Sequence, residues 1–294
     1  VLGKRKDTAN MDKQSKWEWE IRPHTKWFDL NLRELFAYKD LLFRLVRRDF
    51  LMLYQQTLLG PVWIILQPLL TVFVYILIFH KIIGISTNGI PPLLFYLTGI
   101  TLWNLFSDVF IGTASSISGN AGIFSKVYFP RVIMPLSTTL LHFLRFFVQL
   151  LLLVIVLLFY HFTGRYPLAA GNWIFAIYPL IVAGGMGLGF GLIFSVLTVK
   201  YRDLTNLLHL GMRLLMFVCP IFFPVSLVPG EYAWLIQLNP LTPVFEFFRY
   251  SFLGNNAGTF TMMQLLYGTG FMIILLVAGM ALFNKKVDTL MDIV

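Results

Sequence analysis

The chain has 294 residues, a net charge of +9, a mean hydropathy of +0.75 and only 13% charged residues. A soluble domain carries about 25% charged residues, so these values nearly exclude a soluble enzyme and favour an integral membrane protein. With one cysteine, Cys219, the chain forms no internal disulfide, and its sequence contains no cluster with metal-ligand spacing.

The charged residues are concentrated near the N-terminus. Residues 1–58 hold 12 Lys and Arg and 8 Asp and Glu, whereas residues 59–283 hold 9 and 4. This distribution predicts a cytoplasmic N-terminal segment over 1–30, a membrane domain over 59–283 and a polar cytoplasmic tail over 284–294. No apolar run follows a basic start, so we expect no cleavable signal peptide.

Residues 31–58 have apolar side chains at near-helical spacing, from Leu32 to Leu53, with basic residues between them. The pattern predicts an amphipathic helix in the membrane interface, with its basic residues toward anionic lipid headgroups. The alternative is a cytosolic helix packed on a partner protein. Gly60-Pro61 is expected to end this helix and turn the chain into the first span.

Six segments are long and apolar enough to cross about 30 Å of hydrocarbon as helices. None alternates apolar and polar residues as outer-membrane strands do, so an all-α integral membrane fold with six transmembrane helices is predicted. The six segments are residues 61–83, 92–114, 135–160, 173–198, 207–224 and 262–283.

The positions of Lys and Arg predict the orientation of these spans. With the N-terminus in the cytoplasm, the inside segments hold 18 of them and the outside loops 3. Cytoplasmic loops carry this excess, so both termini are predicted to lie inside. The positive charge is therefore explained by the membrane topology, and we expect no nucleic-acid partner.

Three charged side chains lie within the predicted spans: Asp108, Arg145 and Arg213. Such charges are costly, by about 2.5–3.5 kcal/mol on insertion scales. At about 1.5 Å per residue, Asp108 and Arg145 lie at overlapping depths. We therefore predict an Asp108–Arg145 pair between neighbouring spans, with Arg213 as the alternative partner. For Arg213 itself, the simpler interpretation is a side chain that reaches toward the cytoplasm.

The fourth predicted span contains a run of glycines between Gly184 and Gly191. No strand precedes it, so a nucleotide-binding loop is not indicated. Small residues four apart, such as Gly187 and Gly191, allow helices to approach closely. We expect tight helix packing here, with a hinge in a pathway as the alternative.

Residues 225–261 are apolar and aromatic but too short to span the membrane twice. Asn239-Pro240 divides them, which predicts two short re-entrant or interfacial helices over 234–238 and 241–253. Such backbone at membrane depth is tolerated only when it is buried in protein or lines a cavity, which indicates the exit of a pathway.

Two loops between spans combine cations with aromatic residues: KVYFPR at 126–131 and VKYRD at 199–203. Either they anchor the spans at the cytoplasmic surface, or they dock a cytoplasmic partner. The sequence has no GxxxxGK[ST] motif and no catalytic triad pattern, so we expect a transport subunit rather than an enzyme.

Taken together, these loops and three further segments resemble one family. The segments are LYQQTLLGPVWIILQPLL (53–70), NPLTPVFEFFRYSFLG (239–254) and WFDLNLRELFAYKDLLFRLVRRD (27–49). They look like the permease subunit of ABC-2 type polysaccharide exporters, in the branch that exports O-antigen and related lipid-linked glycans. The resemblance covers residues 27–283 in order.

The resemblance implies a homodimer in the bacterial inner membrane, driven by two cytoplasmic ATPase subunits that bind ATP and Mg. The cargo would be a lipid-linked polysaccharide; capsule, teichoic acid or a small amphiphile is the alternative, and a secondary transporter is less expected. Coupling loops at about 119–131 and 199–206 would contact the ATPases. Their contact residues would be Lys126, Val127, Tyr128, Phe129, Pro130, Arg131, Tyr201, Arg202 and Asp203.

An exported glycan needs flat faces for sugar rings and polar contacts. Aromatic residues near polar ones in the first two spans are the candidates, although packing is the alternative for each. At the exit, Glu246, Arg249 and Tyr250 are gate or glycan-contact candidates, with a local ion pair as the alternative. The pathway candidates are Trp63, Gln67, Tyr75, Trp103, Asn104 and Phe106.

Overall fold

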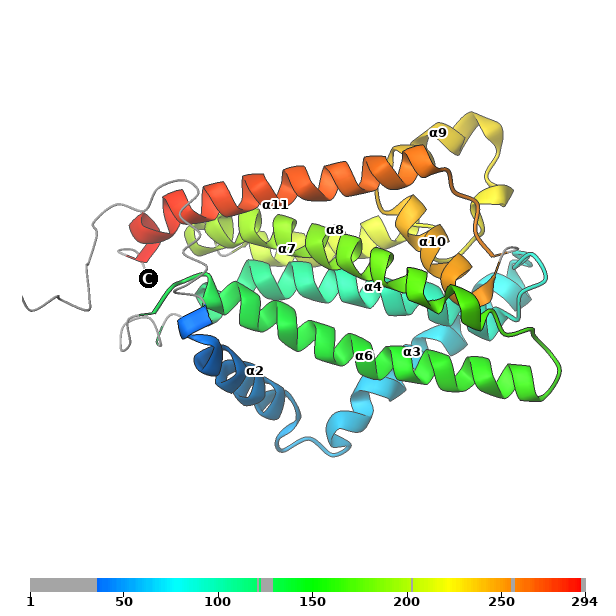
Figure 1. Ribbon diagram of the computed structural model, residues 1–294, viewed down its shortest axis with the longest axis horizontal. Coiled ribbons are helices and arrows are strands. Elements are labelled where there is room, and N and C mark those ends of the chain that lie inside the picture. Colours follow the sequence, from blue (N-terminus) through cyan, green and yellow to red (C-terminus); the bar gives the residue numbers. More distant parts are fainter. Residues whose placement is uncertain (1–35, 121, 123–128, 202, 255–256, 292–294) are drawn as a thin grey trace, which may run out of the picture.

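The computed structural model describes residues 36–291 except 121, 123–128, 202 and 255–256, and all regular structure in these residues is helical (Figure 1). In chain order the elements are α2 (Lys39–Tyr54), η1 (Gly60–Val62), α3 (Trp63–Tyr75), η2 (Ile76–Ile82), α4 (Pro92–Ser115), η3 (Ser118–Asn120), α6 (Ile133–Phe162), η4 (Ala170–Ala176), α7 (Ile177–Lys200), α8 (Leu204–Val218), η5 (Val225–Leu227), α9 (Gly230–Leu238), α10 (Thr242–Leu253) and α11 (Met262–Met291).

Five helical stretches are long and apolar enough to cross a membrane, in agreement with five of the six predicted segments. In each, an 18-residue window contains no more than two charged residues, as the hydrocarbon core of a bilayer requires. The described part of the chain is thus all-helical, and the chain is a membrane protein. The five stretches are Gly60–Ile82, Pro92–Ser115, Ile133–Phe162, Gly171–Lys200 and Met262–Lys286.

The segment predicted as the fifth of six spans, residues 207–224, differs from the other five. Its helix, α8, has 15 residues, whereas a complete crossing needs about 20. The helix ends before Pro220, and a buried irregular segment follows that includes Cys219 and Ile221. Proline supplies no N–H to a helix, so Pro220 and Pro224 explain why the helix stops short of the predicted length.

Helix α7 packs between α4 and α11, and its glycines face both neighbours. A Cβ placed on Gly187 would lie 2.9 Å from the Phe106 carbonyl oxygen of α4. A Cβ on Gly189 would lie 2.9 Å from the Leu275 carbonyl carbon of α11. The glycines therefore permit close helix approach, which confirms the packing interpretation.

Helix α2 lies at one end of the bundle, at an angle to the long helices, and α9 and α10 lie at the opposite end (Figure 1). We call these the α2 end and the α9 end. After α2 the chain turns through Gln56 and Gly60, both with positive φ, and Pro61 opens the next helix. This turn lies where Gly60-Pro61 was predicted to redirect the chain.

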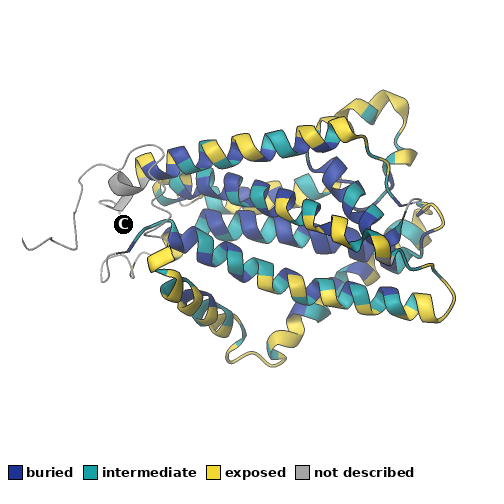
Figure 2. Cartoon of the chain, in the orientation of Figure 1, coloured by how far each residue is buried: buried dark blue, intermediate teal, exposed yellow. Residues whose placement is uncertain are grey.

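Burial follows the same arrangement: buried residues line the centre of the bundle, while α2 and α9 are largely exposed (Figure 2). Helix α4 is buried along most of its length, because other helices surround it. By contrast, α8 exposes an apolar face that includes Leu207, Leu210 and Leu214. An apolar face of this kind requires lipid or another protein surface to cover it.

Candidate functional site

The charged pair predicted within the membrane is present between α4 and α6. The Arg145 Nη1 atom lies 3.2 Å from the Asp108 Oδ2 atom, and both side chains are partly exposed. Each charge thereby offsets the cost that the other would have in an apolar environment. Arg213 takes no part in this pair, since its side chain is exposed on α8.

The face of α6 that carries Arg145 is directed toward α4. One turn before it, the His142 Nδ1 atom lies 4.0 Å from the Asp108 Oδ2 atom. One turn after it, the Gln149 side chain accepts a 3.1 Å hydrogen bond from the Asn104 amide. This polar seam places the pathway candidate Asn104 against protein rather than in an open channel.

Tyr54, the last residue of α2, also belongs to this cluster. Burial raises the pKa of its hydroxyl above the ordinary value of 10.0, and the nearby Arg145 guanidinium partly opposes the rise. The end of the amphipathic helix therefore rests against the charged pair of α4 and α6. Sequence reasoning missed this contact, because no local pattern links residues almost a hundred positions apart.

The remaining pathway candidates fall into two groups. Trp103 and Phe106 are buried in the core of the chain, where packing explains them, and Tyr75 packs edge-to-face against Phe222. In contrast, Trp63 is 42% exposed and Gln67 is also exposed. Of the six candidates, only these two lie on an open surface of α3.

The first predicted coupling loop is described in part. Lys126, Val127 and Tyr128 lie outside the described residues. Phe129 is buried in a small cluster with Leu45 of α2 and with Ile133 and Met134 of α6. Pro130 accepts a backbone hydrogen bond from Ile133, and Arg131 accepts one from Met134, at the start of α6.

The start of this loop also contacts α2. The Arg48 Nη2 atom donates a 3.0 Å hydrogen bond to the Asn120 side chain, and Arg48 also pairs with Asp49. Two residues of α2 thus contact this loop. Arg48 contacts Asn120, which precedes residues 123–128 in the chain, and Leu45 contacts Phe129, which follows them. The sequence predicted neither contact.

The second predicted coupling loop lies at the same end of the bundle, between α7 and α8. Tyr201 is 56% exposed, and the Lys200 ammonium group lies 5.1 Å from the centre of its ring. The backbone carbonyl of Asp203 accepts hydrogen bonds at the start of α8, and Arg202 lies outside the described residues. Exposed aromatic and charged groups at one turn form a surface suited to a protein partner.

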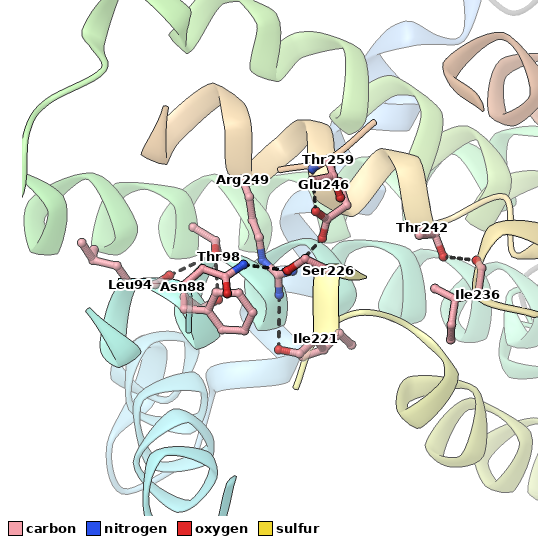
Figure 3. A network of polar contacts seen from close by, with 11 residues as sticks. Asn88, Leu94, Thr98, Ile221, Ser226, Ile236, Thr242, Glu246, Arg249 and Thr259 are labelled. Atoms are coloured by element: carbon pink, nitrogen blue, oxygen red, sulfur yellow. Dashed lines mark hydrogen bonds and ion pairs between the residues drawn. The ribbon is translucent and has the colours of Figure 1, made fainter. Parts of the chain in front are cut away.

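At the α9 end, Glu246 and Arg249 form a fully buried ion pair within α10 (Figure 3). Their Oε1 and Nη1 atoms are 3.0 Å apart, and their side chains are 3% and 1% exposed. The local ion pair predicted as one alternative is therefore present. Because both groups are buried, neither offers a surface contact to a passing molecule.

The pair ties α10 to three other parts of the chain. Arg249 donates to the Ile221 carbonyl at 3.3 Å and lies 3.9 Å from the centre of the Phe95 ring. Glu246 accepts a 2.9 Å hydrogen bond from the Thr259 N–H, just before α11. These contacts offset the desolvation of both charges and fix α10 against α4 and the segment after α8.

Tyr250, the third exit candidate, differs from this pair. It lines a cavity of about 480 Å³ between α9, α10 and the segment before α11. Its ring stacks on Phe247 and meets Phe260 edge-to-face. Among the described residues, no group of three His, Cys, Asp or Glu side chains is placed to hold a metal ion.

Comparison with known proteins places these features in a family. Residues 40–253 match the family described as ABC-2 type transporter. The chain is 32% identical over 257 residues to the O-antigen export system permease protein RfbA of Klebsiella pneumoniae, an alignment that covers 87% of this chain and 94% of that protein.

Two further relatives extend the comparison. An RfbA protein of the same description from Myxococcus xanthus is 28% identical over 225 residues, covering 75% of this chain and 83% of the relative. The polysialic acid transport protein KpsM of Escherichia coli is 23% identical over 234 residues, covering 79% and 88%. The family match over residues 40–253 extends from α2 to α10 and therefore includes both ends of the bundle.

Proposed function

The chain belongs to the ABC-2 type transporter family, and from this premise we propose that it is the membrane permease of an ATP-driven exporter of O-antigen-type, lipid-linked polysaccharide. The observation that carries this proposal is the match over 94% of an O-antigen export permease. Five apolar spans agree with a multi-pass protein of the bacterial inner membrane.

We propose six crossings with both termini in the cytoplasm. Five crossings would be the five long apolar stretches. The additional crossing, which is the fifth along the chain, would be α8 together with the buried segment to Pro224. The excess of Lys and Arg in the segments at the α2 end supports this orientation, because such residues collect on the cytoplasmic side. The short helices α9 and α10 would then be re-entrant helices on the outer side.

Energy would come from two separate ATPase subunits that bind ATP and Mg. They would dock at the α2 end, on residues 126–131 and on the exposed turn at Tyr201 and Asp203. Binding of ATP shifts the transporter from one conformational state to another only if ATP binds more tightly to the ATPases in one of these states. The contacts of Leu45 and Arg48 beside the first loop would pass that difference to α2.

Two copies of the chain would form the pathway between them. Trp63 and Gln67 lie on an exposed face of α3, and α8 exposes Leu207, Leu210 and Leu214. These faces support a homodimer in which aromatic and amide side chains of α3 line the route of the glycan. The lipid carrier would enter beside α2, past Tyr54 and Arg145.

The relationship to the polysialic acid transport protein KpsM shows that a relative is named for another polysaccharide, so we keep capsule polysaccharide as a second candidate cargo. The higher identity and coverage of the O-antigen export permease favour O-antigen. The two candidates are separated by asking which surface polymer a cell loses together with this protein.

The test is deletion of the gene in its own host, followed by complementation. We expect loss of surface O-polysaccharide, accumulation of lipid-linked polymer in the inner membrane, and restoration by the intact gene. As a control, the lipid A and core sugars are measured, because these should stay unchanged. Normal display of O-polysaccharide after deletion would refute the proposed cargo.

A further inference from the structure

Two cavities at the α9 end share lining residues between α9 and the start of α11, and we treat them as the two halves of one groove. Their volumes are about 480 and 580 Å³, and both are lined by Gln237 and Gln264. Small-molecule sites typically have volumes of about 300–1,000 Å³, so each half has the size of a ligand pocket. We call this feature the α9–α11 groove.

Uncharged residues alone line the groove. Aromatic rings line both halves, with Tyr250 in one and Trp234 and Tyr267 in the other. Gln237 and Gln264 line both halves and supply amide groups. None of the described lining residues is Lys, Arg, His, Asp or Glu, so the groove has no full charge for a phosphate, a carboxylate or a metal ion.

The polar groups of the groove retain hydrogen-bonding capacity. Thr261 and Gln264 form a capping box at the start of α11: the Gln264 Oε1 atom accepts from the Thr261 N–H at 2.9 Å, and the Thr261 hydroxyl accepts from the Gln264 N–H at 3.4 Å. The capping box thereby fixes the Gln264 side chain but leaves its NH₂ donors available. Within the described part of the chain, neither Gln237 nor the Tyr250 hydroxyl makes a side-chain hydrogen bond.

The groove is also held in place by its surroundings. The Tyr267 hydroxyl donates a 3.0 Å hydrogen bond to the Leu238 carbonyl, which connects α11 to α9 across one half of the groove. The buried Glu246 fixes the other half through its bond to Thr259. A site that is preformed in this way does not lose binding free energy to ordering of the protein.

From this lining we infer that the α9–α11 groove binds neutral sugar residues of the glycan as it leaves the pathway. Amide donors and acceptors match sugar hydroxyls, and aromatic faces match the apolar faces of sugar rings. The inference rests on the proposed export of polysaccharide and adds an outer binding site for the sugar chain. A lipid headgroup fits less well, because it carries a phosphate that the groove does not neutralise.

The test uses the complete transporter with its ATPase subunits in lipid nanodiscs. The probe is lipid-free O-polysaccharide released from the host's own lipopolysaccharide by mild acid, and the comparison polymer is polyethylene glycol of similar size. Binding is followed by tryptophan fluorescence, and Trp234→Phe shows how much of the signal comes from the groove.

The decisive variant is Gln237→Leu combined with Gln264→Glu. Glutamate keeps the capping box of α11, so the fold is preserved while the amide donors in the groove are lost. We expect saturable binding of O-polysaccharide by the wild type and at least about tenfold weaker binding by the double variant. The matched control, Tyr232→Phe, changes an exposed ring of α9 outside the groove and should bind like the wild type.

Equal affinity of the wild type and the double variant would overturn the inference, as would an equal response to polyethylene glycol. The deletion experiment separates this failure from failure of the proposed function. If deletion abolishes display of O-polysaccharide but the groove variants bind normally, only the groove assignment is wrong. If display survives deletion, the proposed cargo is wrong.

Discussion

Asp108 and Arg145 are two opposite charges within the apolar part of the chain, and each depends on the other. Removing one partner leaves an uncompensated charge, whereas exchanging the two preserves the attraction. We expect Asp108→Asn and Arg145→Met each to lower the free energy of unfolding by about 1–3 kcal/mol. The swap Asp108→Arg with Arg145→Asp should recover part of this loss, as measured by thermal unfolding and membrane abundance. Failure of the swap to recover either quantity would contradict the pair.

Glu246 and Arg249 are buried more deeply, so we expect a larger effect there. Glu246→Gln leaves Arg249 charged and nearly inaccessible to water, which should reduce stability by about 3–5 kcal/mol. Replacing both residues, Glu246→Gln with Arg249→Met, should be less harmful than Glu246→Gln alone. Thermal unfolding of the purified transporter checks this order, and additive losses in the double variant would disprove the coupling.

Tyr54 connects α2 to the charged pair, and its raised pKa determines how its contribution depends on pH. A raised pKa means that the neutral hydroxyl is favoured in the folded protein, so any stabilisation is lost only as the pH rises above about 10. We expect Tyr54→Phe to slow export about two- to fivefold, by the same factor at pH 6 and at pH 9. A factor that changes between these two pH values would show that Tyr54 titrates in this range.

Among the elements, α2 contacts the segment that we propose as the first coupling loop, through Leu45 and Arg48. Leu45 is 6% exposed against Phe129, while Phe43 on the same helix is 62% exposed. We expect Leu45→Ala to reduce the amount of polysaccharide exported per ATP hydrolysed, because it loosens α2 from the coupling loop. Phe43→Ala serves as the control. Equal coupling ratios for the two variants would argue against transmission through α2.

The close packing of α7 can be tested with a matched pair of glycines. A Cβ at Gly189 would press on the backbone of α11, whereas a Cβ at Gly211 of α8 meets nothing within 4 Å. We expect Gly189→Ala to destabilise the protein by about 1–3 kcal/mol. Gly211→Ala should be neutral or slightly stabilising, because alanine favours helix. Similar melting temperatures for the two variants would contradict the packing of α7 on α11.

Most of the helices could be predicted from the sequence, since the length and hydropathy of a span are local properties. The limits of α8 were predicted less well, because the pattern of apolar residues continues through Pro220 and Pro224, where the helix stops. The two short helices predicted over 234–238 and 241–253 correspond to α9 and α10, because Asn239-Pro240 interrupts the helical pattern between them.

Contacts between distant residues were harder to predict. The similar depths of Asp108 and Arg145 in the membrane were enough to predict their ion pair, because an unpaired charge at that depth is costly. Depth alone did not tell whether Trp103 faces the core or a pathway, since aromatic residues suit both. The contact of Arg249 with Phe95 had no local signal at all.

Considered as a whole, the molecule has a basic end at α2 and, at its opposite end, a groove lined by uncharged residues. Helix α2 and the exposed turn at Tyr201 lie at the first end, and α9 and the start of α11, which line the groove, lie at the second (Figure 1). A chain with two such ends suits a route that starts at cytoplasmic ATPases and ends at a surface for neutral sugars. In this proposal, ATP hydrolysis moves the polymer from the α2 end to the α9 end.

Export driven by ATP hydrolysis is tested directly in the reconstituted transporter, paired with an ATPase partner that binds ATP but cannot hydrolyse it. Proteoliposomes would contain the chain, either ATPase and lipid-linked polysaccharide, and the polymer that becomes accessible on the far side would be measured. We expect sustained export with the active ATPase and at most one turnover with the inactive one. Continued export with the inactive ATPase would contradict a transporter driven by ATP hydrolysis.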